Sequence, residues 1–203
     1  MLPADKEKLD LYKIIESKNR LGVGYRMRQC DSISVPQATD FSWRLSVKSS
    51  PEKPRWIIVG FQTGNKSDQK TNAAIFDNLD LRNINVYLNS RRYPEVDYDL
   101  TFDKNSFSRI FGEASDFRSK FYRMDELISN CNITPIDFKN IYPLFVIDVS
   151  KQSERLKNST TDIQVKATFN TIVPANTNAY AMVISDKIIS FQSDGKKLSV
   201  IQS

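Results

Sequence analysis

Histidine is absent from this sequence. It is the usual general base of Ser-His-Asp and Cys-His catalytic sites and a frequent zinc ligand, so these kinds of site are excluded. Only two cysteines are present, Cys30 and Cys131, which are too few for a four-cysteine zinc site and show no disulfide spacing pattern. We therefore expect no metal site, and two reduced thiols of the kind found inside cells.

Long apolar runs and nucleotide-binding glycine motifs are also missing. No run approaches the ~18 apolar residues of a membrane-spanning helix, and no apolar segment follows the N-terminal residues MLPADKEK. Neither GxxxxGKS/T nor GxGxxG occurs, because Gly22-Val-Gly24 lacks the third glycine. We predict no cofactor, no membrane partner and no secretion by a signal peptide.

Charge is present in moderation and is spread along the chain. The net charge is +5 and the pI about 9.1, with short basic clusters at residues 26–28, 91–92 and 196–197 rather than a basic tract. This distribution favours a solvated positive surface over a nucleic-acid groove, so nucleic acid is expected to bind at most weakly.

Carboxylates are plentiful, and two close pairs, Asp97/Asp99 and Asp125-Glu126, are formal candidates for a glycosidase-type acid and base. Exposed acids on a strand and at a helix end explain them better, so we predict that the protein is not an enzyme. Asp148 ends an apolar strand and is expected to accept hydrogen bonds from turn amides or to pair with a basic side chain, because an unpaired buried carboxylate is costly.

The hydrophobic pattern predicts a β-sandwich. Residues 144–149 (LFVIDV) are almost continuously apolar, as in a strand covered on both faces, whereas residues 163–169 (IQVKATF) alternate strictly between apolar and polar. The polar residues 150–162 between them suggest a crossing from one sheet to another. Further strands are predicted at residues 25–30, 33–35, 41–48, 55–63, 82–89, 96–102, 179–184, 187–191 and 198–201, with a hairpin across Ser185-Asp186.

Two helices are predicted, at residues 4–19 and 104–124. The second has Asp103 as its expected N-cap and a stripe of apolar residues at helical spacing, so we expect it to cover one end of the sandwich. Gly60, inside the strand at 55–63, suggests a bulge or a close backbone approach. Residues 64–80 form a long polar excursion that Phe76 is expected to pin to the surface, and residues 127–141 are expected to be irregular.

Four segments in order resemble one protein family. They are RWIIVGFQTG (55–64), VYLNS (86–90) before Tyr93-Pro94, FVIDVS (145–150) with Gln152, and AYAMVISD (179–186). They are similar to segments of the double jelly-roll major-capsid-like proteins of Maverick/Polinton and adintovirus-type elements, copies of which are abundant in insect genomes. The residues that carry the resemblance are Gln62, Tyr87, Asn89, Tyr93, Pro94, Phe145, Asp148, Ser150 and Gln152.

The resemblance implies a mainly β jelly roll, with two packed antiparallel sheets. Family members carry two rolls per chain and form trimers, whereas this sequence has room for one roll, similar to the second, after an N-terminal helix. We therefore expect a helical arm at residues 1–20 and a single jelly-roll domain at residues 21–203, either as a fragment or as a single-roll derivative. The implied location is a virion or the cell interior.

The implied function is structural self-assembly through lateral contacts, with copies of the chain, and a first roll from the same or another chain, as partners. The excursion 64–80, residues 91–97 and 127–141 and the helix 4–19 are the expected contacts, with Lys66, Phe76, Arg91 and Arg92 as individual candidates. Two alternatives remain open: a carbohydrate-binding face made of Trp43, Trp56, Tyr87 and Tyr93, and a nucleic-acid-binding role in packaging.

Overall fold

A computed structural model describes residues 5–17, 20–46, 53–64, 70, 72–124, 132–152, 161–193 and 198–201. Within these residues the chain forms three helices and nine strands, and it divides into two compact units, residues 28–185 and residues 1–27 with 186–203. The elements are α1 (Asp5–Glu16), β1 (Leu21–Ser34), β2 (Asp40–Arg44), β3 (Pro54–Thr63), β4 (Leu81–Leu88), β5 (Arg91–Tyr93), α2 (Ser108–Tyr122), α3 (Pro135–Asn140), β6 (Phe145–Asp148), β7 (Ile163–Phe169), β8 (Thr177–Ser193) and β9 (Leu198–Ile201).

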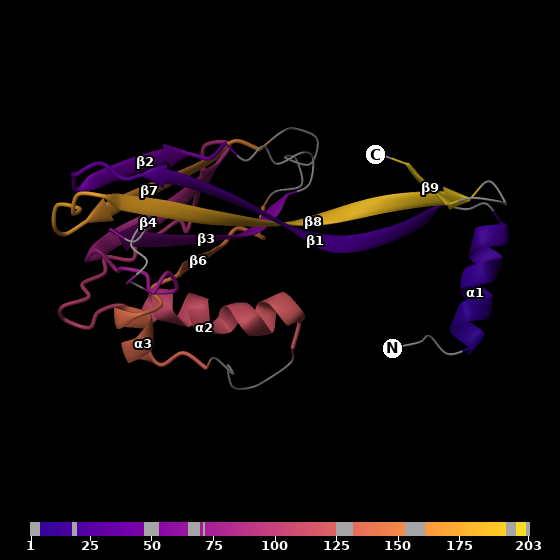
Figure 1. The fold of residues 1–203 in the computed structure, drawn as a ribbon, viewed down its shortest axis with the longest axis horizontal. Coiled ribbons are helices and arrows are strands. Elements are labelled where there is room, and N and C mark those ends of the chain that lie inside the picture. Colours follow the sequence, from indigo (N-terminus) through magenta and orange to yellow (C-terminus); the bar gives the residue numbers. More distant parts are fainter. Residues whose placement is uncertain are drawn as a thin grey trace. The chain divides into compact units, whose positions relative to one another are not determined.

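The first eight strands form one jelly roll. One sheet has the order β1-β8-β3-β6 and the other β2-β7-β4-β5, while β9 adds to β8 (Figure 1). The first strand thus lies beside the eighth, the second beside the seventh, the third beside the sixth and the fourth beside the fifth. A hairpin of strands rolled up on itself gives this order, and it distinguishes a jelly roll from a simple meander. The predicted fold class is confirmed.

Strands β3 and β6 are buried on both faces, as their apolar runs predicted. Ile57 and Phe61 of β3 point into the core between the sheets, together with Phe145 of β6, and are at most 1% exposed. The alternate residues Trp56 and Ile58 point outward and pack under α2. A strand without a solvated face has no position where a polar side chain would meet water. This explains why apolar and polar residues do not alternate in these strands.

The second sheet alternates. On β7, Val165 and Ala167 are buried in the inter-sheet core, whereas Gln164 and Lys166 point to the other face. β7 lies between β2 and β4, with Val165 opposite both Trp43 and Val86. The polar residues after β6 therefore lead from one sheet to the other, as predicted, although residues 153–160 lie outside the described residues.

Helix α2 differs from the prediction in its start and its position. The residue before it is Phe107, which makes no side-chain capping bond, so Asp103 is not the N-cap. The helix lies along the outer face of the β3-β6 sheet, not over one end of the sandwich (Figure 1). Trp56 and Ile58 point out of this sheet, and Phe121 of α2 packs against them. The helix lies here because this packing removes their apolar side chains from water.

Three further predictions of secondary structure are wrong. Residues 21–34 form one strand through Gly22 and Gly24, and β8 continues through Ser185-Asp186 instead of turning there. Ser185 pairs with Pro54 of β3, so hydrogen bonding to the neighbouring strand overrides the local turn signal. Residues 135–140 form a helix rather than an irregular segment, because Thr134 and Asp137 make a reciprocal capping box before Pro135 at the helix start.

The smaller unit contains α1, the first part of β1, the last part of β8, and β9. The predicted N-terminal helix is confirmed, and none of the residues of α1 is buried. An ion pair of 3.5 Å between Arg26 and Asp186 links β1 to β8 within this unit. The division into an arm at residues 1–20 and one domain at 21–203 stays a prediction.

Candidate assembly surface

The segment after β4 folds back along the edge of the second sheet. Asn89 and Ser90 connect β4 to β5 with φ angles of 47° and 73°. Two consecutive residues with positive φ are typical of the tight hairpin turns that match the twist of the strands. The Asn89 side chain also accepts a hydrogen bond of 2.8 Å from the amide of Asp162, which fixes the turn to the start of β7. The Arg44 guanidinium binds both oxygens of Asp162 at 2.7 Å, and this contact raises the pKa of Arg44.

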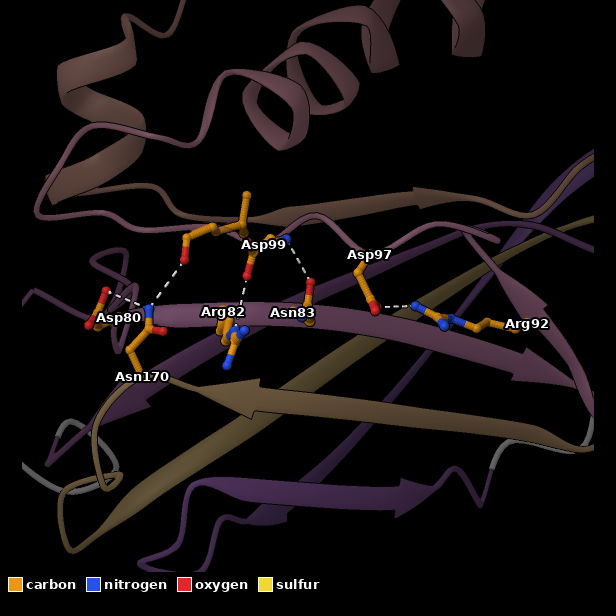
Figure 2. Close-up of polar contacts among 8 residues, drawn as sticks. Asp80, Arg82, Asn83, Arg92, Asp97, Asp99 and Asn170 are labelled. Carbon is orange, nitrogen blue, oxygen red and sulfur yellow. Dashed lines mark hydrogen bonds and ion pairs between the residues drawn. The ribbon is translucent and has the colours of Figure 1, made fainter.

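Arg92, on β5, is held from two sides. Its terminal nitrogen pairs with the carboxylate of Asp97 (Figure 2). Its Nε donates to Oδ1 of Asn85 at 2.8 Å. Arg91 instead points to solvent, with its guanidinium 5.5 Å from the centre of the Tyr93 ring and 3.5 Å from Glu95. Of the two predicted contact arginines, Arg92 thus orders its own loop, whereas Arg91 is the exposed one.

The chain then runs beside the first half of β4 without forming a strand. Asp99 has a φ of 48° and donates its amide hydrogen to Oδ1 of Asn83 at 2.8 Å, while its carboxylate lies 3.0 Å from Nε of Arg82 (Figure 2). The amide of Leu100 donates to the carbonyl of Arg82 at 2.8 Å. Positive φ at Asp99 interrupts the extended backbone, so the strand predicted at 96–102 is wrong.

Asn170 ties this segment to the other end of β7. Its amide nitrogen donates to the carboxylate of Asp80 and to the carbonyl of Leu100, both at 3.2 Å (Figure 2). Asp97 and Asp99 each pair with an arginine, and Asp99 also bonds through its amide to Asn83. These contacts are the structural role that we preferred to catalysis. The other pair, Asp125-Glu126, lies outside the described residues. Exposed ion pairs contribute little stability, so these contacts mainly orient the loop.

The polar excursion between β3 and β4 is fastened at its described end. The Gln62 side chain donates to the carbonyls of Ala73 and Ile75 at 2.8 and 2.9 Å. Phe76 lies directly against Gly60, where an added Cβ would be only 2.6 Å from the ring. Gly60 therefore marks the predicted close approach, and Phe76 pins the excursion to the sheet as predicted. Lys66 lies outside the described residues.

The motif at the end of β6 attaches the chain that follows this strand to its own sheet. Oδ1 of Asp148 accepts the amide hydrogen of Ser150 at 2.9 Å, which confirms the expected turn hydrogen bond. Nε2 of Gln152 donates to the carbonyls of Pro54 and Val149 at 2.6 and 2.7 Å, so the chain leaving β6 is attached to the beginning of β3.

The family model described as the double jelly roll-like domain matches residues 2–189. This chain belongs to that family. The resemblance to double jelly-roll proteins seen in the sequence is confirmed, and the jelly-roll fold agrees with it. No curated protein matches the sequence.

Solved virus structures are among those similar to this double jelly roll-like chain. PBCV-1 VP54, in a structure fitted into a reconstruction of the virophage Sputnik, is 12% identical with a TM-score of 0.50; the match covers 98% of this chain and 55% of that one. A chain of the Sputnik virophage structure is 12% identical (TM-score 0.49, 90% and 39% covered), and the mavirus major capsid protein is 14% identical (TM-score 0.39, 89% and 41% covered). The chain thus spans about two fifths to just over half the length of these structures.

The motif residues of this double jelly roll-like chain do not form one site. They lie at separate places, and most of them attach a turn or loop to the sandwich through the hydrogen bonds described above. Phe145 instead lies in the core, with its ring centre 6.0 Å from that of Phe61. Pro94 follows Tyr93 through a cis peptide bond. Sequence reasoning missed the partners Arg82, Asn83, Asn85 and Asn170; the alternating asparagines of β4 were the one available signal.

The alternative carbohydrate face is not formed by the predicted rings. Trp43, Trp56 and Tyr93 are only 4–7% exposed, and they belong to the hydrophobic cores. Tyr87 is the one that reaches the surface, with Nζ of Lys166 located 4.7 Å from its ring centre. A sugar needs a solvent-facing ring to stack on, so this prediction is wrong for these residues.

The part of the chain that the structure describes contains no cluster of three or more acidic, cysteine or histidine side chains suited to a metal ion. No described helix is both long enough and apolar enough to cross a membrane. An apolar groove of about 470 Å³ lies on the outer face of the β1-β8-β3-β6 sheet, and its lining includes Ile58, Gly60, Phe76, Leu144 and Met182.

Tyr98, in the segment at 91–101, is predicted to make the stability of the protein depend on pH. Burial, and then the nearby Glu113 carboxylate, raise the pKa of Tyr98 to about 12, although Arg109 opposes the shift. An unfolded tyrosine ionises near pH 10. The stabilising effect of neutral Tyr98 is therefore complete below about pH 10 and is lost as the pH rises toward about 12. Urea unfolding at pH 9, 10 and 11 should show a steeper alkaline loss for the wild type than for Tyr98→Phe; parallel losses would contradict the assignment.

Proposed function

We propose that this protein is a non-catalytic structural protein that builds a capsid-like shell through lateral contacts between jelly rolls. The observation that carries the proposal is the complete eight-strand roll in a chain of the double jelly roll-like family. A jelly roll of this kind works by presenting rigid loops to its neighbours, and the loops at 72–80 and 91–101 are held in place by side-chain hydrogen bonds. Rigid contact loops reduce the entropy that association costs.

The proposed partners are copies of this chain, in a trimer or a larger closed assembly, and a first roll from the same or another chain. The match over only 39–55% of the solved chains supports a second roll as partner. We further propose a Polinton- or adintovirus-type origin, in a virus or as a domesticated insect copy. The location would be the virion or the cell interior, with residues 1–20 acting as an arm of the domain at 21–203.

Sedimentation velocity of the purified chain over a range of concentration, salt and pH tests the proposal, with negative-stain images of any large species. We expect concentration-dependent growth beyond the monomer. Arg91→Ala should weaken this growth, because its guanidinium is exposed beside the proposed contact loop. Lys104→Ala is the matched control, since it removes an exposed charge in a turn that is not a proposed contact. A strict monomer under all conditions would overturn the proposal.

The nucleic-acid alternative has its own test. Retention on heparin or DNA at low salt, lost steeply as salt increases, is expected of a protein that packages nucleic acid. With a net charge of +5, we expect weak retention at most. Tight retention at moderate salt would favour packaging over purely structural assembly.

A further inference from the structure

One of the sheet edges is unlike the others, which include the four-residue strand β9 beside β8. The edge strands β6, β2 and β5 have four, five and three residues, whereas β1 has 14. Nine residues of β1 are exposed, and none is buried. Natural proteins usually keep edge strands short or covered, because a long exposed edge is a template for another strand.

Near its C-terminal end, β1 directs some of its backbone hydrogen-bonding groups away from β8. The Val35 amide donates to the carbonyl of Thr177 at 2.8 Å, on the side of β8. Amide groups alternate in direction along a strand, so the amide of Ser32 faces away from β8. Ser32 N–H accordingly donates to the side chain of the adjacent Asp31, at 2.9 Å, and not to a strand. No described strand pairs with this edge of the sheet. A partner strand would compete with the Asp31 carboxylate for the Ser32 amide, and that carboxylate also accepts the amide and hydroxyl hydrogens of Ser46 at 2.7 and 2.8 Å.

We propose that β1 pairs in antiparallel fashion with β1 of a second copy of this chain across a two-fold axis. The proposal rests on the self-assembly proposed above and names one contact surface for it. A partner strand should be long and unpaired on one side, and among the described strands only β1 itself meets both conditions. A two-fold contact is self-complementary, so each copy contributes the same groups to the other.

The charges of β1 select the register. In a two-fold antiparallel pair, one residue lies opposite itself, and residues equally far from it on either side face one another. A centre at Arg28 or Asp31 would set identical charges against each other, and a centre at Met27 would oppose Arg26 to Arg28. A centre at Gln29 would place Met27 against Asp31. Only the centre at Cys30 sets Met27 against Ile33 and keeps each arginine opposite a serine, Arg28 with Ser32 and Arg26 with Ser34.

In this register the exposed side chain of Cys30 would lie beside Cys30 of the second copy. A disulfide between the two would therefore report the pairing. Directly opposed Cα atoms in an antiparallel pair are about 4.5–5.5 Å apart, which lies within the range that a disulfide bridges. Cysteines at position 29 would be offset by two residues along the strand, and cysteines at 28 by four. Those offsets of about 7 and 13 Å exceed what a disulfide spans without backbone movement.

The test is oxidative cross-linking of the full chain with Cys131→Ser as background, read on a non-reducing gel. We expect covalent dimers through Cys30, with the yield falling at least fivefold when the single cysteine is moved by Arg28→Cys, Gln29→Cys or Ser32→Cys in a Cys30→Ser chain. Similar yields at all four positions would indicate random collision and would overturn the pairing.

A second variant tests the backbone contact itself. Ser32→Pro removes the outward amide and leaves the bonds to β8, so it should weaken dimerisation at least tenfold; Ser32→Ala keeps the amide and should not. If Ser32→Pro fails to fold, the cysteine positions still decide. Large assemblies without cross-linking through Cys30 would overturn the edge pairing alone. Dimers cross-linked through Cys30 that never grow further would instead overturn the shell proposal alone.

Discussion

Phe145→Ala is expected to lower the free energy of unfolding by about 3–5 kcal/mol. Phe145 is fully buried at the centre of the inter-sheet core, where its ring centre lies 6.0–6.3 Å from those of Phe61, Phe102 and Phe138. Removing the ring leaves a cavity among three other rigid rings, which cannot collapse into it. Domains of this kind are stable by only about 5–15 kcal/mol. A loss of this size therefore removes a large part of the stability and raises the unfolded fraction.

Urea denaturation followed by tryptophan fluorescence measures this effect. Phe145→Leu is the matched control, since it keeps most of the apolar volume and should cost much less. We also expect assembly to fail for Phe145→Ala at temperatures where the sandwich melts. A loss below about 1 kcal/mol for the alanine variant would mean that the two sheets do not depend on this ring.

Trp56→Ala is expected to cost a similar amount, about 3–5 kcal/mol, but with its effect concentrated on α2. The indole ring centre lies 5.8 Å from those of Phe117 and of Phe121, the two α2 rings that cover it. Among the described residues, no other aromatic ring of the β3-β6 sheet belongs to this outer cluster. Loss of the indole therefore removes the main attachment of the helix without opening the core between the sheets.

Hydrogen exchange distinguishes this outcome from general unfolding. Amides of α2 should exchange many times faster in Trp56→Ala, whereas those of β7, in the other sheet, should keep most of their protection. Trp56→Phe preserves an aromatic contact with the helix and should lie between the two. Equal acceleration in α2 and β7 would show that the helix and the roll unfold as one unit, which would contradict the prediction.

These two variants also bear on function, because they separate the roll from its outer cover. If lateral contacts are made by the loops at 72–80 and 91–101, then Trp56→Ala should leave assembly largely intact below its melting temperature. The groove and the edge strand β1 lie on the same sheet as α2. A strong assembly defect in a folded Trp56→Ala chain would place the contacts on that sheet.

The local hydrophobic pattern correctly predicted the strands that are covered on both faces and the strands that have one solvated face. Residues 55–63 and 144–149 are apolar throughout because they are covered on both faces, and residues 82–89 and 163–169 alternate because one face is solvated. In each case the environment of a side chain depends on which face of its own strand it occupies. That information is contained in the order of neighbouring residues, so the sequence is sufficient.

The polar attachments were beyond such reasoning. Arg92 meets Asn85 and Asp97, and Asn170 reaches Asp80 and Leu100, because the roll brings β4, β5 and β7 together. Nothing in the local sequence of an asparagine or arginine names its distant partner. The predicted carbohydrate rings were wrong for the same reason, since Trp56 is covered by a helix that lies more than fifty positions later in the chain.

The sequence by itself determined the class of the fold, the absence of histidine-based chemistry, the N-terminal helix and the family. Only the tertiary structure decided that β1 and β8 are single long strands, that residues 96–102 run beside β4 without joining it, and that β1 is left as an open edge. The physical reason is that hydrogen bonds of a sheet join distant parts of the chain. Whether a segment becomes a strand, and whether its edge is free, depends on which neighbour it meets.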